Sequence, residues 1–443
     1  MTKLTLPDSV MSIGKGAFCG CSGLTELTLP DSVMSIGKGA FCGCSGLTEL
    51  TLPDTLECIE AFAFCGCSGL TELTLPNRVR IIEVSAFECS GLTELTLPNS
   101  VKIIGDGAFA YCSGLEKITV ESGNSRYDSR DNCNSIIDKK TNTLIAGCKN
   151  SVIPNGVTSI GDSAFGWCSE LTELVLPNSV TSIVESAFAY CSGLEKITVE
   201  SGNSCYDSRD NCNSIIETET NTLIAGCKNS VIPNSVTSIG DSAFEGCTGL
   251  TELTLPKSVT SIGDGAFADC SGLTELTLSN SLKCIEACAF AYCSGLTELT
   301  LPNSVKSIGR YAFQGCSDLT ELTLPNSVKS IGDRAFAYCS GLTELTLPNS
   351  VTSIGNCAFG GCSGLTELTL PNSITSIGDY AFAYCSDLSK ITSLAEIPPM
   401  CGFKVFNGVN KTNCELIVPE GSVAAYTRAY GWNGFSNIRA FPK

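Results

Sequence analysis

The pattern of apolar and polar positions along the chain predicts short strands that face two environments. In the segment Leu24-Thr25-Glu26-Leu27-Thr28-Leu29-Pro30, leucines alternate with polar residues. Because successive side chains of a strand point to opposite faces, Leu27 and Leu29 should point inward, and Glu26 and Thr28 outward. Pro30 should end the strand, since it has no N–H to donate to a neighbouring strand. A second apolar set follows and should return across the back of the same coil.

This unit recurs along the chain every 23 residues, as from Phe18 to Phe41 and from Phe41 to Phe64. The copies place an Ala-Phe pair at a fixed position, with phenylalanines at Phe18, Phe41, Phe64, Phe87, Phe109, Phe165, Phe188, Phe244, Phe267, Phe290, Phe313, Phe336, Phe359 and Phe382. A constant period of this length is typical of a solenoid, in which one coil cannot bury its apolar set alone and stacked coils form a continuous core. The sequence therefore predicts a single elongated stack.

The repeat L-T-L-P-N-S-V-T-S-I-G-D-x-A-F-x-x-C-S-G-L-T-E resembles the BspA-like (Treponema pallidum-type) leucine-rich repeat family over nearly the whole chain. The resemblance implies a leucine-rich repeat solenoid with 23-residue repeats and a parallel β-sheet on its concave face. It also implies a non-enzymatic binding scaffold, secreted or displayed on the cell surface, that mediates adhesion or other protein–protein interactions. A scaffold of this kind does not by itself specify a ligand.

Two nearly identical insertions interrupt the repeats. Residues 121–150 recur almost unchanged as residues 200–229, and each contains a β-hairpin pattern such as Ser135-Ile136-Ile137-Asp138 followed by Leu144-Ile145-Ala146. The polar stretch from Asn124 to Asn134 should lie on the surface. We expect a solenoid over residues 1–393 that includes both insertions. Residues 394–443 should form a last repeat and a cap, with a short helix carrying Val423, Tyr426 and Tyr430 on one face.

The cysteines and the absence of histidine argue against a catalytic or metal site. The chain has 28 cysteines, of which one recurs after each Ala-Phe pair, and no histidine. Small thiols filling a buried ladder explain the recurring position, where we expect Cys44, Cys67, Cys89 and their equivalents. Cys19, Cys42 and Cys65 should stack on neighbouring coils, about 5 Å apart and close enough to bridge if the Cβ directions allow it. We expect no catalytic residues, no cofactor and no metal.

The charge balance limits the classes of partner. With 27 basic and 45 acidic residues the formal net charge is −18, whereas nucleic-acid binding needs a basic surface. No apolar run is long enough to span a bilayer. No secretion signal is visible at Met1, and the first strand lacks a polar cap. We therefore expect a fragment or a domain whose N-terminal neighbour has been cut away, and the missing signal does not decide where the protein is located.

One outward position of the strands carries a column of like charges. In the regular C-terminal repeats the column consists of Glu252, Glu275, Glu298, Glu321, Glu344 and Glu367. Two interpretations stay open: a solvated face that prevents aggregation, and an acidic surface for a basic segment of a partner. The insertion loops supply a second candidate, Tyr127, Arg130, Tyr206 and Arg209, because Tyr and Arg are enriched at binding hot spots. Packing of these loops against the solenoid explains the same residues equally well.

The function hypothesis is an extracellular or cell-surface scaffold that binds a protein partner, such as a host or matrix protein or a basic segment. The alternative is a structural module that self-associates through its uncapped N-terminal coil, whose strand edges would stack on another copy.

Overall fold

The computed structural model describes residues 2–441, which pack as two compact units, Met1–Glu219 and Thr220–Lys443. Each unit is a stack of coils with parallel strands. The coils follow one another at the predicted period, so that Lys3 pairs with Glu26 in the first unit and Glu252 with Glu275 in the second. The boundary between the units falls within the second insertion. The division expected at residue 393, between the solenoid and a last repeat with its cap, stays a prediction.

The strands that begin with Glu or Lys are called front strands here. In the N-terminal unit they are β1 (Lys3–Thr5), β3 (Glu26–Thr28), β5 (Glu49–Thr51), β8 (Glu94–Leu97), β10 (Lys117–Val120), β15 (Glu173–Leu176) and β17 (Lys196–Val199). In the C-terminal unit they are β22 (Glu252–Thr254), β24 (Glu275–Thr277), β26 (Glu298–Thr300), β28 (Glu321–Thr323), β30 (Glu344–Thr346), β32 (Glu367–Leu370), β34 (Lys390–Ser393) and β36 (Glu415–Val418), followed by the last strand of the same ladder, β37 (Asn437–Ala440). Their pairing is parallel and in register, so that Leu27 lies opposite Leu4 and Leu50.

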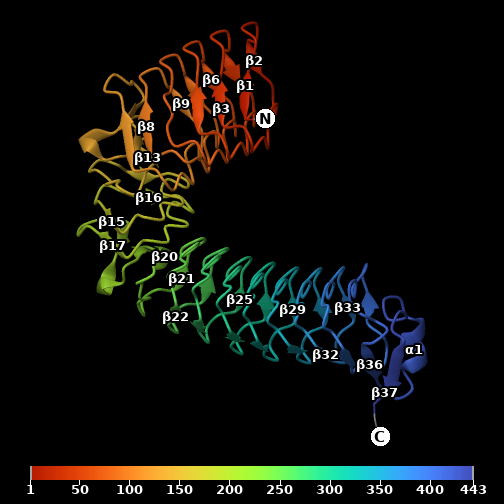
Figure 1. Ribbon diagram of the computed structural model, residues 1–443. Coiled ribbons are helices and arrows are strands. Elements are labelled where there is room, and N and C mark those ends of the chain that lie inside the picture. The colour runs from red at the N-terminus through yellow and green to blue at the C-terminus, as the bar shows by residue number, and fades with distance from the viewer. Residues whose placement is uncertain (1, 442–443) are drawn as a thin grey trace. The chain divides into compact units, whose positions relative to one another are not determined.

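A second set of two-residue strands, the back strands, pairs in parallel across the return of each coil. In the N-terminal unit these are β2 (Ser12–Ile13), β4 (Ser35–Ile36), β6 (Cys58–Ile59), β7 (Ile81–Ile82), β9 (Ile103–Ile104), β14 (Ser159–Ile160) and β16 (Ser182–Ile183). In the C-terminal unit they are β21 (Ser238–Ile239), β23 (Ser261–Ile262), β25 (Cys284–Ile285), β27 (Ser307–Ile308), β29 (Ser330–Ile331), β31 (Ser353–Ile354), β33 (Ser376–Ile377) and β35 (Met400–Cys401). Figure 1 shows β25, β29 and β33 along one edge of the C-terminal unit and β22 and β32 along the opposite edge. The hydrophobicity pattern indicates an apolar return at this place but not a second ladder of strands.

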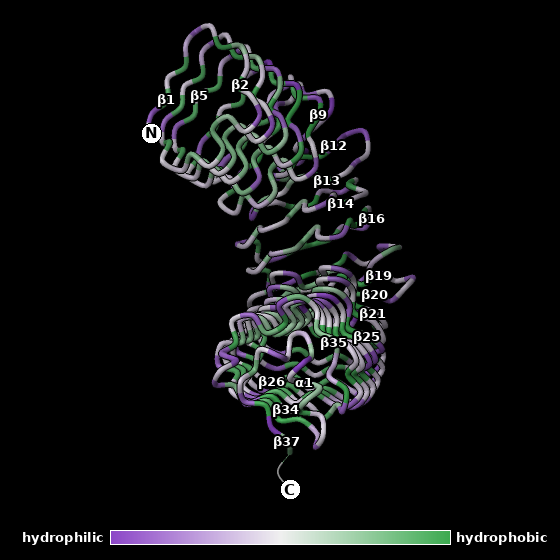
Figure 2. The backbone as a smooth tube through the Cα atoms, turned by 90° about the vertical axis from the view of Figure 1, so that its right-hand side faces the viewer, coloured by the Kyte–Doolittle hydropathy of each residue, from purple (hydrophilic) through white to green (hydrophobic). Residues whose placement is uncertain are grey.

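The core between the two ladders is continuous within each unit. Phe290, Phe313 and Phe336 are fully buried and stack with ring centroids 5.4 Å apart and planes within 6° of parallel. Viewed nearly end-on, the coils of the C-terminal unit lie one behind another, so that the backbone of each coil follows that of the next (Figure 2). The predicted solenoid core is confirmed.

The recurring cysteines lie in this core beside the phenylalanines. The thiol of Cys316 donates a hydrogen bond to the carbonyl oxygen of Phe290 at 3.4 Å, and Cys339 does the same to Phe313 at 3.3 Å. The expected position of Cys89 is wrong. The coil that begins before Phe87 is one residue shorter than the others, because Phe109 follows Phe87 after 22 residues and not 23. In this coil Ser90 takes the inner place, 3% exposed and 3.1 Å from the sulfur of Cys112, and Cys89 is exposed. Compared with the other coils, this coil therefore lacks a residue after the core position and not before it.

The insertions build coils of their own. In the first, β11 (Tyr127–Asp128), a 3-10 turn (Arg130–Asn132), β12 (Ile136–Asp138) and β13 (Thr143–Ala146) follow one another. The hairpin β12–β13 is antiparallel, as expected, and β13 then pairs in parallel with the back strand β14. The second insertion contains β18 (Tyr206–Asp207), a 3-10 turn (Arg209–Asn211) and β19 (Ile215–Glu217) in the N-terminal unit, and β20 (Thr222–Ala225) in the C-terminal unit.

The last coil is covered by an aromatic cluster around the helix α1 (Val423–Arg428). Trp432 and Tyr426 are fully buried, and Phe406 continues the phenylalanine stack beneath them, 5.8 Å from Phe382 and 5.1 Å from Trp432. The indole N–H of Trp432 donates to the carbonyl of Pro399 at 2.9 Å. Tyr430, expected on the same helical face, lies beyond the helix and is 63% exposed.

Candidate functional site

The glutamate column of the C-terminal unit lies on the solvent side of the front strands. Each of the six residues is exposed, and the leucine that follows points inward. The register pairs them directly, as Glu252 with Glu275, Glu298 with Glu321, and Glu344 with Glu367. Since parallel strands lie about 4.8 Å apart, these carboxylates form a dense negative stripe. We call these six residues the acidic stripe.

Threonine hydroxyls hold the front of the coils in position beside the acidic stripe. Thr274, Thr320 and Thr366 each donate to the carbonyl oxygen of the threonine one coil earlier, at 3.2, 3.2 and 3.0 Å. The main chain at the stripe is thus fixed by side-chain and backbone hydrogen bonds alike. A rigid scaffold lowers the entropic cost of ordering a binding surface.

Where lysine replaces glutamate in the column, it forms an ion pair with a glutamate of an adjacent coil. Lys390 lies 2.9 Å from Glu367, and Lys117 lies 3.4 Å from Glu94. In residues 220–441 no ion pair neutralises the five glutamates from Glu252 to Glu344. The acidic stripe therefore keeps most of its negative charge.

A hollow opens on the front of the N-terminal unit, which the sequence did not indicate. Residues 71–76 form no regular strand, although they carry the same Thr-Glu-Leu pattern. A cavity of about 490 Å³ lies there, lined by Glu49, Leu50, Glu72 and Leu73 among others. Both leucines are only partly buried, so this part of the column combines acidic and apolar groups.

The insertion loops place their tyrosines inside the structure. Tyr127 is 3% exposed and Tyr206 is 5% exposed. The hydroxyl of Tyr127 accepts a hydrogen bond from the backbone N–H of Ile104 at 2.9 Å, and burial raises the pKa of both tyrosines. These side chains hold the insertions against the preceding coil, so the structure favours packing over partner contact.

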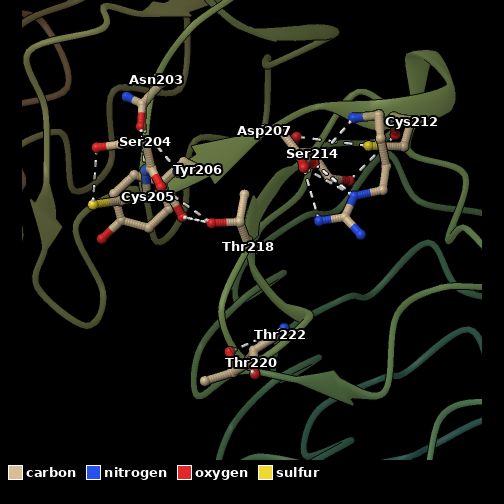
Figure 3. A network of polar contacts seen from close by, with 11 residues as sticks. Asn203, Ser204, Cys205, Tyr206, Asp207, Cys212, Ser214, Thr218, Thr220 and Thr222 are labelled. Carbon is tan, nitrogen blue, oxygen red and sulfur yellow. Dashed lines mark hydrogen bonds and ion pairs between the residues drawn. The ribbon is translucent and has the colours of Figure 1, made fainter.

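The expectation that residues 124–134 lie on the surface is wrong at Asn124, Tyr127 and Cys133, which are all buried. Asn124 is 2% exposed, and its amide donates to the carbonyls of Pro98 and Val101 at 2.9 and 3.1 Å. In the second copy, Asn203 makes the equivalent bonds, and its side-chain oxygen accepts from the N–H groups of Cys205 and Tyr206 (Figure 3). The asparagine thus satisfies backbone groups that the insertion would otherwise leave unpaired.

The two arginines of the loops are half-buried and engaged with neighbouring aspartates. Arg130 lies 2.9 Å from Asp128, and Arg209 lies 2.7 Å from Asp207. The Asp207 carboxylate raises the pKa of Arg209. These ion pairs are local, between near neighbours in the chain, and stiffen the loops. The arginines are less available to a partner than the acidic stripe is.

The cysteines are free thiols in the structure, most of them buried. All 28 are free, and within residues 2–441 no three histidine, cysteine or acidic side chains are grouped so as to hold a metal ion. Burial raises the pKa of the thiols in the core ladder, to about 12 for Cys316. A thiol that stays protonated is a poor nucleophile and metal ligand.

A column of exposed tyrosines was missed by the sequence interpretation. Tyr292, Tyr338 and Tyr384 each follow a core phenylalanine by two positions, and they are 48%, 61% and 63% exposed. The sequence does contain a signal for this column, because tyrosine at this repeat position alternates with Gly315 and Gly361 in the intervening coils.

In the part of the chain that the structure describes, no helix is both long and apolar enough to span a membrane.

Comparison with known proteins places this arrangement in a family. The family model for the BspA type leucine rich repeat region, with six copies, matches residues 1–116, 135–227, 224–343 and 306–415. A search of curated proteins gave no match.

Several solved bacterial structures are similar to this chain. A leucine-rich repeat protein from Bacteroides ovatus is 31% identical, with 82% of this chain and 83% of that chain covered and a TM-score of 0.36. A leucine rich cell surface protein from Faecalibacterium prausnitzii is 28% identical, with 89% and 88% covered and a TM-score of 0.44. One from Eubacterium ventriosum is 25% identical, with 82% of each chain covered and a TM-score of 0.46. With the family model matching most of the residues, the chain belongs to the BspA type leucine-rich repeat family.

Proposed function

We propose that this protein is a non-enzymatic scaffold that binds a basic segment of a partner protein along the acidic stripe. The observation that carries the proposal is the register of exposed glutamates, five of the six without an ion pair, on a front face fixed by threonine hydrogen bonds. Like charges on adjacent strands repel, and this repulsion is relieved when a basic ligand binds. Family membership supports the scaffold role.

The experiment is a matched charge reversal. The stripe variant replaces Glu275, Glu298 and Glu321 with lysine, and the control replaces the exposed acids Glu286, Asp318 and Asp387, which lie off the stripe. Both variants change the net charge equally. Binding of a fluorescent peptide containing six lysines separated by Gly-Ser is followed by anisotropy at two salt concentrations.

We expect the stripe variant to bind at least tenfold more weakly than the wild type, since each exposed charge pair contributes about 0.2–1 kcal/mol. The control variant should lose less than threefold. Equal losses in both variants would show that net charge alone attracts the peptide and would overturn the proposal.

We also propose that the protein acts outside the cell or on its surface, in adhesion. Family membership supports this, and protease treatment of intact producing cells tests it: digestion of the protein is expected, and full protection contradicts it. Light scattering over a hundredfold concentration range tests the alternative of self-association, which a constant monomer mass would exclude.

A further inference from the structure

The exposed tyrosine column has a strained backbone. Tyr338 and Tyr384 have φ angles of 62° and 61°, and Gly361 between them has 78°. Glycine adopts this left-handed conformation freely, whereas a tyrosine does so at a cost in conformational free energy. Burial of the ring does not offset the cost, because both rings are more than half exposed. The same position is left-handed in other coils as well, at Trp167, Asp269 and Tyr292, so this conformation is a property of the coil and the tyrosines adopt it without gaining burial.

The two tyrosines flank an apolar pit that covers three consecutive coils. The middle coil contributes small residues, Cys357, Gly360 and Gly361, whereas the neighbouring coils place larger side chains at the equivalent positions. Tyr338 leans over Gly361 so closely that a Cβ atom there would lie 2.6 Å from the ring. The pit has a volume of about 100 Å³, enough for one small ring.

The charge at the pit is opposite to that of the chain as a whole. Arg334 is the only charged residue in its lining, and the chain has a net charge of −18. The guanidinium of Arg334 lies 5.5 Å from the ring centroid of Tyr311, and the guanidinium of Arg310 lies 4.6 Å from the same ring. In residues 220–441 no ion pair involves either arginine. A carboxylate on an occupant would therefore find an unneutralised partner here.

The spacing of the walls fits a polyproline II helix. Tyr338 and Tyr384 are two coils apart, which is about 10 Å, and a polyproline II helix repeats every three residues, about 9.3 Å. Such segments bind between aromatic side chains and lose little entropy, because their conformation is formed in advance. Besides the tyrosines the lining includes the small residues Ala337, Gly360 and Ala383, which leave room for an apolar ring.

We propose that this pit binds an acidic, proline-containing extended segment of a partner protein, with a proline between Tyr338 and Tyr384 and a carboxylate on Arg334. The site lies on a different part of the coil from the acidic stripe. It does not depend on the function proposed above, and the two tests use peptides of opposite charge.

The test is fluorescence anisotropy of the full chain with a labelled peptide of three Pro-Pro-Glu repeats. Peptides of Pro-Pro-Lys and Gly-Gly-Glu repeats separate charge from conformation. Cys357→Tyr fills the pit with a residue that the same position carries at Tyr311 and Tyr380, both with positive φ. Cys288 stands at the same repeat position as Cys357 but outside the pit, so Cys288→Tyr is the matched control.

We expect Pro-Pro-Glu to bind at least tenfold more tightly than Gly-Gly-Glu. Pro-Pro-Lys is also attracted by the acidic stripe, so only the part of its binding that Cys357→Tyr removes is assigned to the pit, and we expect that part to be at least tenfold weaker than the binding of Pro-Pro-Glu. Cys357→Tyr and Tyr384→Gly should each weaken binding at least tenfold, and Cys288→Tyr less than twofold. Glycine adopts the left-handed conformation of residue 384 without strain, so the Tyr384→Gly variant should unfold at the same temperature as the wild type. A loss of binding in this variant would then reflect the lost tyrosine ring and not a lost fold. Arg334→Glu should shift the preference to Pro-Pro-Lys.

Three results would overturn the proposal. One is equal binding of Gly-Gly-Glu, and another is unchanged affinity in Cys357→Tyr. The third is displacement of the peptide by a soluble β-linked oligosaccharide at lower concentration than by unlabelled Pro-Pro-Glu, which would assign the pit to glycans.

Discussion

Three buried thiols of the C-terminal unit should make its stability fall steeply in alkali. Burial raises the pKa of Cys247, Cys316 and Cys385 from an ordinary value of 9.0 to about 12. The unfolded chain therefore loses these protons at a lower pH than the folded chain. The stabilisation is complete below about pH 9 and is lost as the pH rises through 12.

The loss of stability follows from the difference between the ordinary pKa of 9.0 and the folded-state pKa of about 12. Between the two pKa values each thiol lowers the free energy of unfolding by about 1.4 kcal/mol per pH unit. At pH 10, relative to pH 7, each thiol should cost about 1.4 kcal/mol, and the three together about 4 kcal/mol if their coils unfold together. Replacing all three by alanine should remove this part of the pH dependence.

The assay is urea unfolding at pH 7 and pH 10 under reducing conditions. Trp167→Phe leaves the buried Trp432 as the one remaining tryptophan and as a fluorescent probe of the C-terminal unit. The drop in unfolding free energy between the two pH values should be about 4 kcal/mol smaller in the triple alanine variant than in its parent. Equal drops would refute the reasoning, because tyrosines and lysines are shared by both proteins.

Three further changes test the core, the insertion and the acidic stripe. Phe313→Ala removes a fully buried ring from the stack and should cost about 3–5 kcal/mol by urea unfolding, whereas Phe403→Ala, at a half-exposed ring, should cost about 1 kcal/mol or less. Asn124→Ala removes two bonds to buried carbonyls and should cost about 2–3 kcal/mol, against less than about 0.5 kcal/mol for exposed Asn150→Ala; similar costs would show that burial of the amide is unimportant. Replacing Glu298 and Glu321 with glutamine should raise stability by about 1 kcal/mol at low salt and leave it unchanged in 1 M salt, and a gain that persists in high salt would contradict charge repulsion.

Features that recur in every coil could be predicted from the sequence because the period fixes which face each side chain occupies. The inward leucines, the phenylalanine stack, the thiol ladder and the exposed glutamates all follow from one coil and its copies. The antiparallel hairpin of the first insertion could also be predicted, from two apolar runs around a turn. These are local patterns, and a solenoid reinforces them because each coil contacts its neighbours alone.

Features that break the period depend on contacts between coils. Polar composition placed Asn124 on the surface, yet its amide reaches the carbonyls of Pro98 and Val101 in the preceding coil and is buried. Tyr127 is buried for the same reason, through a bond to Ile104. In the short coil, Ser90 replaces Cys89 because the core position is fixed by the neighbouring coils and not by residue type.

The sequence alone thus determined the family, the coil and the two faces of each front strand. Only the tertiary structure decided what three adjacent coils form together. The pit beside Tyr338 exists because small residues in one coil lie between large ones in the coils on either side. Stacking at about 4.8 Å brings equivalent residues of successive coils into contact, and a site made by such contacts is visible only once the coils are placed side by side.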